Sequence, residues 1–129
     1  MNSFLNSALT FFLRRRKPNV ERDGQEALLN YALHLAQEWG NEWMQPIQQR
    51  LAKSFPNLSV VELNQLNDLA QSTMRYCYNV AYELYEKTEG GDIGKEWKAD
   101  CLSKYAWIDD KNLNDLLSTG RHYAMRDLG

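Results

Sequence analysis

The sequence has few of the residues that mark disorder, export or metal binding. It contains three prolines, seven glycines, two cysteines and two histidines in 129 residues. So little proline and glycine leaves no room for long low-complexity tracts, and two cysteines without a Cys-x-x-Cys pair give neither a disulfide framework nor a zinc motif. The length predicts a single domain, residues 1–129, whose core needs no disulfide or metal for stability.

The chain also lacks a strong charge of either sign and a long apolar run. A net charge of −2 and a pI near 5.7 give no general attraction for nucleic acid, so we expect no nucleic-acid partner. The apolar stretch from Phe4 to Leu13 is about half as long as the roughly 20 residues that span a bilayer. Its cations follow it, whereas a secretory signal has them first. We therefore expect a cytoplasmic protein with both cysteines reduced.

Apolar residues recur at three- and four-residue spacing, and this pattern predicts an all-α, single-domain bundle of about five helices. Ser59 and Glu62 form a Ser-x-x-Glu capping box that should begin a long central third helix, which stops at Gly90 and Gly91. No internal repeat is evident. The other helices are expected at residues 2–16, from 22–25 to Phe55, after Asp92, and after Asp109 and Asp110. The one that ends near Phe55 is either a single helix with a bend between Gly40 and Pro46 or two stacked pieces.

One glycine falls on the buried face of the last expected helix. Gly120 shares that face with Leu113, Leu116, Leu117 and Ala124. A glycine inside a helix costs about 1 kcal/mol relative to alanine. We therefore predict that another helix crosses closely at Gly120.

His34 and Glu38 are the nearest approach to a metal motif, because residues four apart can present two ligands from one helix face. Asn30, Gln37 and Asn41 share their side, whereas leucines and tryptophans occupy the other. We expect this pair to face water and predict no metal site.

No other titratable side chain falls in a recognisable catalytic or cofactor motif. His122 lies away from the leucines of its helix and is expected to be solvated. Cys77 and Cys101 lie on apolar stripes, where a buried thiol is unreactive. The glycines of the segment 86–96 match neither a calcium loop nor a phosphate loop. We therefore predict no catalytic residue and no cofactor.

Two surfaces are candidates for binding a partner. The first comprises Asp68, Arg75, Tyr78, Asn79 and Tyr82, toward the polar side of the third helix. Exposed tyrosine near arginine is typical of interaction hot spots. The alternative interpretation is that the tyrosines lie under a neighbouring helix.

The second surface is the first expected helix, whose broad apolar face is followed by four cations. We favour packing of this helix on its own domain, because its large apolar side chains would otherwise remain in water. Part of the helix could still contact a second chain or a membrane. The residues that we assign to this contact are Phe11, Leu13, Arg14, Arg15, Arg16 and Lys17.

The sequence alone thus favours a non-enzymatic protein–protein interaction module, such as a small cytoplasmic regulatory, inhibitor or immunity-type protein. Its partner would be another protein or a second copy of the chain. Two alternatives stay open. One is a peripheral membrane protein anchored by the helix 2–16, and the other is an enzyme or ligand carrier with a pocket between helices.

Overall fold

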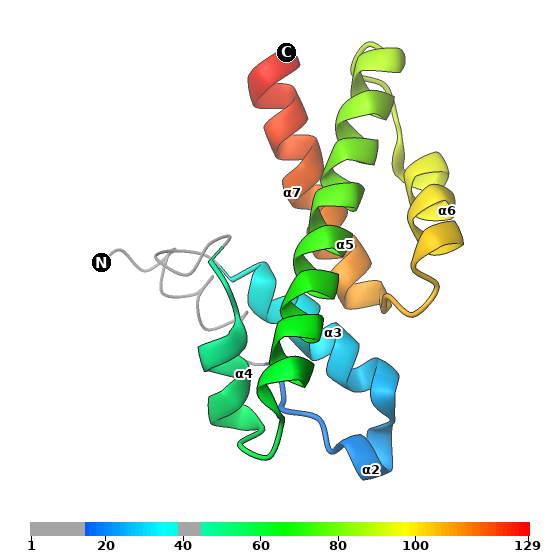
Figure 1. The fold of residues 1–129 in the computed structure, drawn as a ribbon. Helices are drawn as coiled ribbons and strands as arrows, with labels where there is room; N and C mark the ends of the chain where they lie inside the picture. The colour runs from blue at the N-terminus through cyan, green and yellow to red at the C-terminus, as the bar shows by residue number, and fades with distance from the viewer. Residues whose placement is uncertain (1–14, 39–44) are drawn as a thin grey trace, which may run out of the picture. The chain divides into compact units, whose positions relative to one another are not determined.

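The computed structural model describes residues 15–38 and 45–129 (Figure 1), and every regular element in these ranges is an α-helix. The all-α class is confirmed. The predicted first helix, with Phe11, Leu13 and Arg14, lies outside the described residues, as does the segment 39–44, where we expected a bend. The described helices are α2 (Val20–Asp23), α3 (Gln25–Ala36), α4 (Gln48–Ser54), α5 (Val60–Lys87), α6 (Gly94–Lys104) and α7 (Asp110–Leu128).

The long central helix is confirmed as α5, which has 28 residues. It begins with the predicted capping box, in which the Glu62 N–H donates to Ser59 Oγ and the Ser59 N–H donates to Glu62 Oε1, both at 3.1 Å. It ends in a turn where Gly90 adopts a φ of 84° and its N–H donates to the Tyr85 carbonyl. The chain forms two compact units, Met1–Ala70 (unit 1) and Gln71–Gly129 (unit 2), so α5 contributes to both.

In unit 1, α3 is buried on more than its apolar side. Leu28, Ala32 and Leu33 are buried, and so are the polar residues Asn30 and His34. The expectation that His34 faces water is therefore wrong, since only 2% of the residue is exposed. The Asn30 amide can be buried because it donates to the Glu26 carbonyl one turn earlier. Sequence periodicity shows which residues share one face of a helix, but it does not show how many of its faces contact other helices.

In unit 2, α6 and α7 pack with the second half of α5. The Trp97 indole N–H donates to the Cys77 carbonyl at 2.8 Å, and both residues are buried. A Cβ added at Gly120 of α7 would lie 2.9 Å from the Cβ of Ala81 on α5. The predicted tight crossing at Gly120 is confirmed, because a side chain there would overlap Ala81.

The junction between α4 and α5 recurs between α6 and α7. α4 ends at Phe55 with φ −133° and ψ 75°, and α6 ends at Tyr105 with φ −129° and ψ 72°. Three residues later the Leu58 N–H donates to the Phe55 carbonyl, and the Ile108 N–H donates to the Tyr105 carbonyl, both at 3.2 Å. The two turns therefore share one backbone conformation.

The helix starts that follow these turns also match. Ser59 caps α5 by accepting from the Glu62 N–H, and Asp109 caps α7 by accepting from the Asn112 N–H. The four residues that follow Glu62 and Asn112 have the sequence Leu-Asn-x-Leu in both helices, at 63–66 and at 113–116. Sequence and capping thus agree on how the two segments correspond.

The correspondence extends to α3 and to the second half of α5, because each contributes one ring of an equivalent aromatic pair. Tyr31 of α3 contacts Phe55 edge to face at 5.7 Å and 77°, and Tyr76 of α5 contacts Tyr105 at 5.6 Å and 76°. Units 1 and 2 are therefore two copies of one three-helix motif, and α5 supplies the last helix of one copy and the first of the next. The expectation of no internal repeat is wrong. Few residues are identical, and α6 has 11 residues where α4 has seven, so a fixed spacing misses the repeat.

Candidate functional site

Unit 1 contains an open groove of about 380 Å³ between α3, the turn after α4 and the first half of α5. Leu28 and Leu66 are buried in its floor, whereas Leu29, Leu58 and Leu69 are half-buried and accessible from outside. Apolar side chains can bind in such a groove because they remove this apolar area from water. Its lining consists of Val20, Gln25, Leu28, Leu29, Phe55, Leu58, Glu62, Gln65, Leu66 and Leu69, which we call the unit 1 groove.

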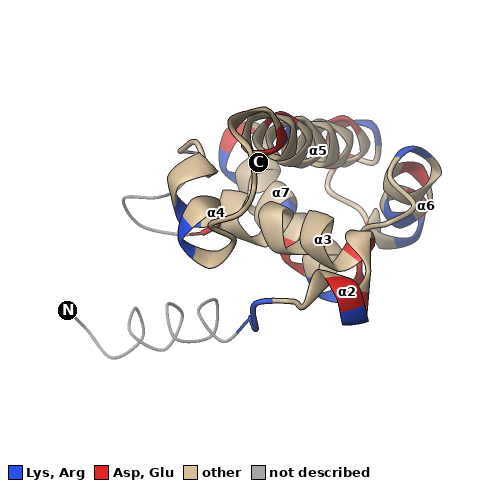
Figure 2. Cartoon of the chain, turned by 60° about the horizontal axis from the view of Figure 1, so that its bottom comes forward, with Lys and Arg blue, Asp and Glu red and all other residues tan. Residues whose placement is uncertain are grey.

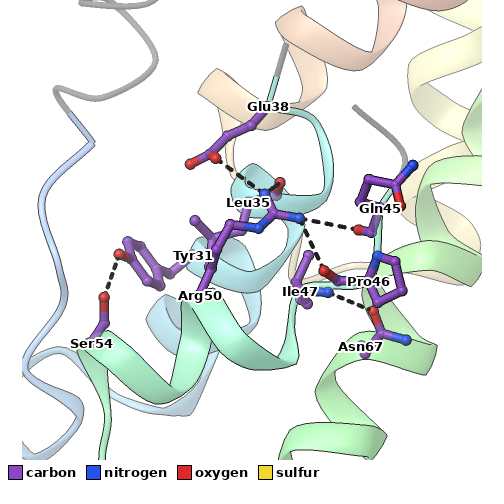
Figure 3. Close-up of polar contacts among 9 residues, drawn as sticks. All are labelled: Tyr31, Leu35, Glu38, Gln45, Pro46, Ile47, Arg50, Ser54 and Asn67. Carbon is purple, nitrogen blue, oxygen red and sulfur yellow. Dashed lines mark hydrogen bonds and ion pairs between the residues drawn. The ribbon is translucent and has the colours of Figure 1, made fainter. Parts of the chain in front are cut away.

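Arg50 connects α4, which lies directly before the turn that lines the groove, to the end of α3 (Figure 3). Its guanidinium donates to the Leu35 carbonyl at 2.7 Å and to the carbonyls of Gln45 and Pro46 at 3.1 and 3.2 Å. It also forms an ion pair with Glu38 at 3.1 Å. The carbonyls at the end of a helix lack partners within the helix and carry partial negative charge, so a cation is stabilising there. Glu38, expected to face water, is instead half-buried and paired.

Further hydrogen bonds join α4 and the residue before it to α3 and α5, the two long helices that line the groove (Figure 3). The Ile47 N–H donates to the Asn67 amide oxygen of α5 at 3.1 Å. The Tyr31 hydroxyl of α3 hydrogen-bonds the Ser54 hydroxyl at 2.9 Å. The groove is thus held in shape by polar contacts behind its walls, and its apolar lining is left available.

The corresponding face of unit 2 is closed. Leu58 and Glu62 of the unit 1 groove correspond to Ile108 and Asn112 in unit 2. Ile108 is 5% exposed and Asn112 is fully buried, whereas Leu58 is half-buried and Glu62 is exposed. The same three-helix motif therefore has this face covered in one copy and open in the other.

Two exposed valines lie beside the groove at the start of α5. Val60 and Val61 are 72% and 64% exposed, and they directly precede Glu62 of the lining. The corresponding residues in unit 2 are Asp110 and Lys111, which are charged as a solvated helix start normally is. Unit 1 thus has additional apolar surface next to its open groove.

The chain reaches the groove from its N-terminal side. Lys17 Nζ lies 5.2 Å from the centre of the Phe55 ring, and Val20 is part of the lining. Among the predicted contact residues, Arg15 is half-buried and Arg16 and Lys17 are exposed. Lys17 is the member of that predicted surface that the structure places at the groove.

The predicted tyrosine surface contacts α7. Tyr78 is half-buried and lies edge to face with Tyr123 of α7 at 6.5 Å. Its burial raises the pKa of Tyr78. Tyr82 bonds to Asp127 near the end of α7. Tyr78 thus packs against α7, as the alternative interpretation has it, whereas Tyr82 is half-buried with only a polar contact to α7. Arg75 and Asn79 are exposed in unit 2, and Asp68 is exposed in unit 1.

Two further features concern alternatives raised by the sequence. Within residues 15–38 and 45–129, no three His, Cys, Asp or Glu side chains gather as ligands of a metal ion. Over the same ranges, no helix combines the length and the apolar character needed to cross a membrane. His122 is exposed, as predicted, and its ring lies 5.7 Å from that of Tyr123.

No known family model, curated protein or solved structure matches this chain. The function is therefore argued from the groove itself. Sequence reasoning missed the groove because its lining comes from three separate segments that periodicity treats one at a time. The adjacent apolar pair Val60 and Val61, placed just inside a capping box where charge is usual, was the available signal.

Proposed function

We propose that the protein is a non-enzymatic interaction module whose unit 1 groove binds the apolar face of an amphipathic helix from another protein. The observation that carries the proposal is that this face is open and apolar in unit 1, while Ile108 and Asn112, which correspond to Leu58 and Glu62, are buried in unit 2. An amphipathic helix places apolar side chains at three- and four-residue spacing, which suits a groove with a helix along each side. The cytoplasmic location, predicted because the N-terminal sequence does not match a secretory signal, is part of the proposal.

The composition of the groove supports binding to a protein. Its floor is apolar, and Gln25, Glu62 and Gln65 supply polar groups at its edge, as in the core and rim of protein interfaces. Val61, which directly precedes Glu62 and is 64% exposed, adds apolar area next to the lining. The groove is therefore suited to a few large apolar side chains rather than to a charged substrate.

The charges around the groove favour a partner helix with basic residues beside its apolar face. Glu62 lines the groove, and Glu21 and Glu26 are exposed on α2 and α3, each of which contributes to the lining. Figure 2 shows the acidic residues of α2 in red. The nearby cations are Arg22, which is paired with Asp23 at 2.8 Å, and Lys17, which lies 5.2 Å from the centre of the Phe55 ring. Complementary charge of this kind would increase the association rate and select among partners.

Catalysis is a weaker explanation of the same site. Glu62 is the one ionisable residue in the groove lining among the described residues, and its carboxylate is already bonded to the Ser59 N–H. A general acid or base needs a reacting group within hydrogen-bond reach and normally a second polar group to orient it. The groove offers apolar area instead, which suits binding.

A selection from a display library of amphipathic helical peptides tests the proposal. Peptides that bind the full chain should lose at least about tenfold in affinity, or about 1.4 kcal/mol, when Leu69→Asp places a charge in the groove. Val61→Lys, which copies the residue at the equivalent position of unit 2, should weaken the same peptides. Fluorescence anisotropy gives the dissociation constants.

Met125→Lys is the matched control, because Met125 is 53% exposed on α7 and is not part of the groove. It should leave the affinities unchanged. If all selected peptides bind Leu69→Asp as tightly as the parent chain, the groove is not the binding site. If no peptide binds but an apolar small molecule does so in a Leu69-dependent way, the protein is a ligand carrier.

A further inference from the structure

We propose that the unit 1 groove is occupied within the same molecule by the chain's own apolar segment, residues 3–13, which a partner helix must displace. This proposal deepens the proposed function in one respect, since it assigns an occupant to the same groove. The proposed occupant lies outside the described residues and directly precedes residues 15–20, which reach the groove.

The described part of the chain begins close to the groove. Lys17 lies over Phe55, and Val20 lines the groove. Leu13 precedes Lys17 by only four residues, so the segment is tethered beside the groove. A short tether keeps the effective concentration of the segment near the groove in the millimolar range. A second copy of the chain would have to reach that concentration in solution to compete.

The segment 3–13 has the distribution of apolar and polar residues that suits the groove. Leu5, Leu9 and Phe12 follow one another at four- and three-residue spacing, so they share one face if the segment is helical. Ser7 and Thr10 fall on the opposite side. The segment thus has one large apolar face and one polar face. It is directly followed by cations, which is the charge that the acidic border of the groove favours.

In unit 2 some residues that correspond to the groove lining are half-buried, such as Tyr105 and Thr119. Others are fully buried, namely Met74 and Leu116. Their equivalents in unit 1 are Leu29 and Leu66, and Leu29 is only half-buried. A motif whose apolar face is covered in one copy needs a cover in the other. The apolar segment 3–13 precedes Lys17, which contacts Phe55 at this face, by only a few residues in sequence.

The experiment uses the full chain with 13C-labelled leucine methyl groups. Phe12→Asp should release the segment and shift the methyl resonances of Leu29, Leu58 and Leu69. The methyl groups of Leu113 and Leu116 in unit 2 report on any general loss of structure and should not shift. Ser7→Asp is the matched control, because it adds the same charge to the polar side of the segment.

The second measurement is the affinity of a peptide selected to bind the groove. If the segment occupies the groove for more than nine-tenths of the time, Phe12→Asp should raise the affinity at least about tenfold. Unchanged methyl resonances in Phe12→Asp would overturn the proposal, and peptide binding that depends on Leu69 would still leave the proposed function standing.

Two other outcomes are informative. If the methyl shifts occur but no peptide binds even to Phe12→Asp, the segment is a permanent part of unit 1, and the proposed function fails while the occupant is correct. If Phe12→Asp shifts the groove resonances only at concentrations where light scattering detects a dimer of the parent chain, the occupant is the segment of a second copy. That result also overturns the intramolecular proposal.

Discussion

Cys77 and Cys101 contact each other in unit 2, yet both are free and fully buried. The hydrogen bond between their side chains, together with burial, raises the pKa of the Cys77 thiol, so it stays neutral at physiological pH. We expect no reaction with a thiol reagent in the native protein and two thiols per chain after denaturation without reductant. Fewer than two, with an intact monomer mass, would show a disulfide.

Tyr76 links the protonation of one phenol to stability at high pH. Its hydroxyl donates to the Asp100 carboxylate at 2.5 Å, and this bond together with burial raises the pKa of Tyr76 from 10.0 to about 12. The neutral phenol is thus favoured by folding. Its contribution is complete below pH 10 and is lost as the pH rises toward 12.

The corresponding experiment compares the parent chain with Tyr76→Phe. The midpoint of urea denaturation should fall more steeply between pH 10 and pH 12 in the parent, because Tyr76→Phe has no proton to lose at this position. Tyrosinate absorbance should show one late-titrating phenol in the parent chain that is missing in the variant. Equal pH profiles for the two proteins would contradict the assignment.

At the scale of elements, the crossing of α5 and α7 depends on the missing side chain at Gly120. Gly120→Leu should destabilise the protein by about 1–3 kcal/mol through overpacking, because even a Cβ would lie 2.9 Å from Ala81. Ser118→Leu, at an exposed position of the same helix, is the control. Urea denaturation measures both. A more stable Gly120→Leu would mean that the helices separate easily here.

Arg50 is expected to matter more than other cations of α4, because four oxygen acceptors converge on it. Arg50→Met keeps much of the aliphatic chain but leaves the Leu35 carbonyl and the Glu38 carboxylate without this cation. We expect a loss of about 1–3 kcal/mol in unfolding free energy. Lys53→Met on the exposed side of α4 should have a much smaller effect. Similar losses in the two variants would refute the special role of Arg50.

The elements differ in how well sequence predicts them. The start of α5 was predicted because Ser59 and Glu62 supply a local, reciprocal pair of hydrogen bonds. The surroundings of α3 were not predicted, because the burial of His34 depends on residues that are distant from it in the sequence. The groove was missed for the same reason. Local bonding leaves a signature in adjacent residues, and tertiary burial does not.

At the scale of the whole molecule, deleting residues 1–14 tests the packing of the N-terminal segment by stability alone. If the segment covers the groove, the melting temperature should fall by at least about 4 °C, which corresponds to roughly 1 kcal/mol for a chain of this size. Light scattering should report the same oligomeric state for both proteins. An unchanged melting temperature, with flotation on anionic liposomes by the full chain only, would favour the membrane alternative.

Because α5 belongs to both copies of the three-helix motif, the architecture can grow without adding a complete copy. A third copy after α7 would need only two new helices, since α7 could serve as its first helix as α5 does for unit 2. Tandem duplication would therefore lengthen the protein in steps of a helical hairpin. Such growth would leave the unit 1 groove unchanged, because every residue of its lining lies before residue 71.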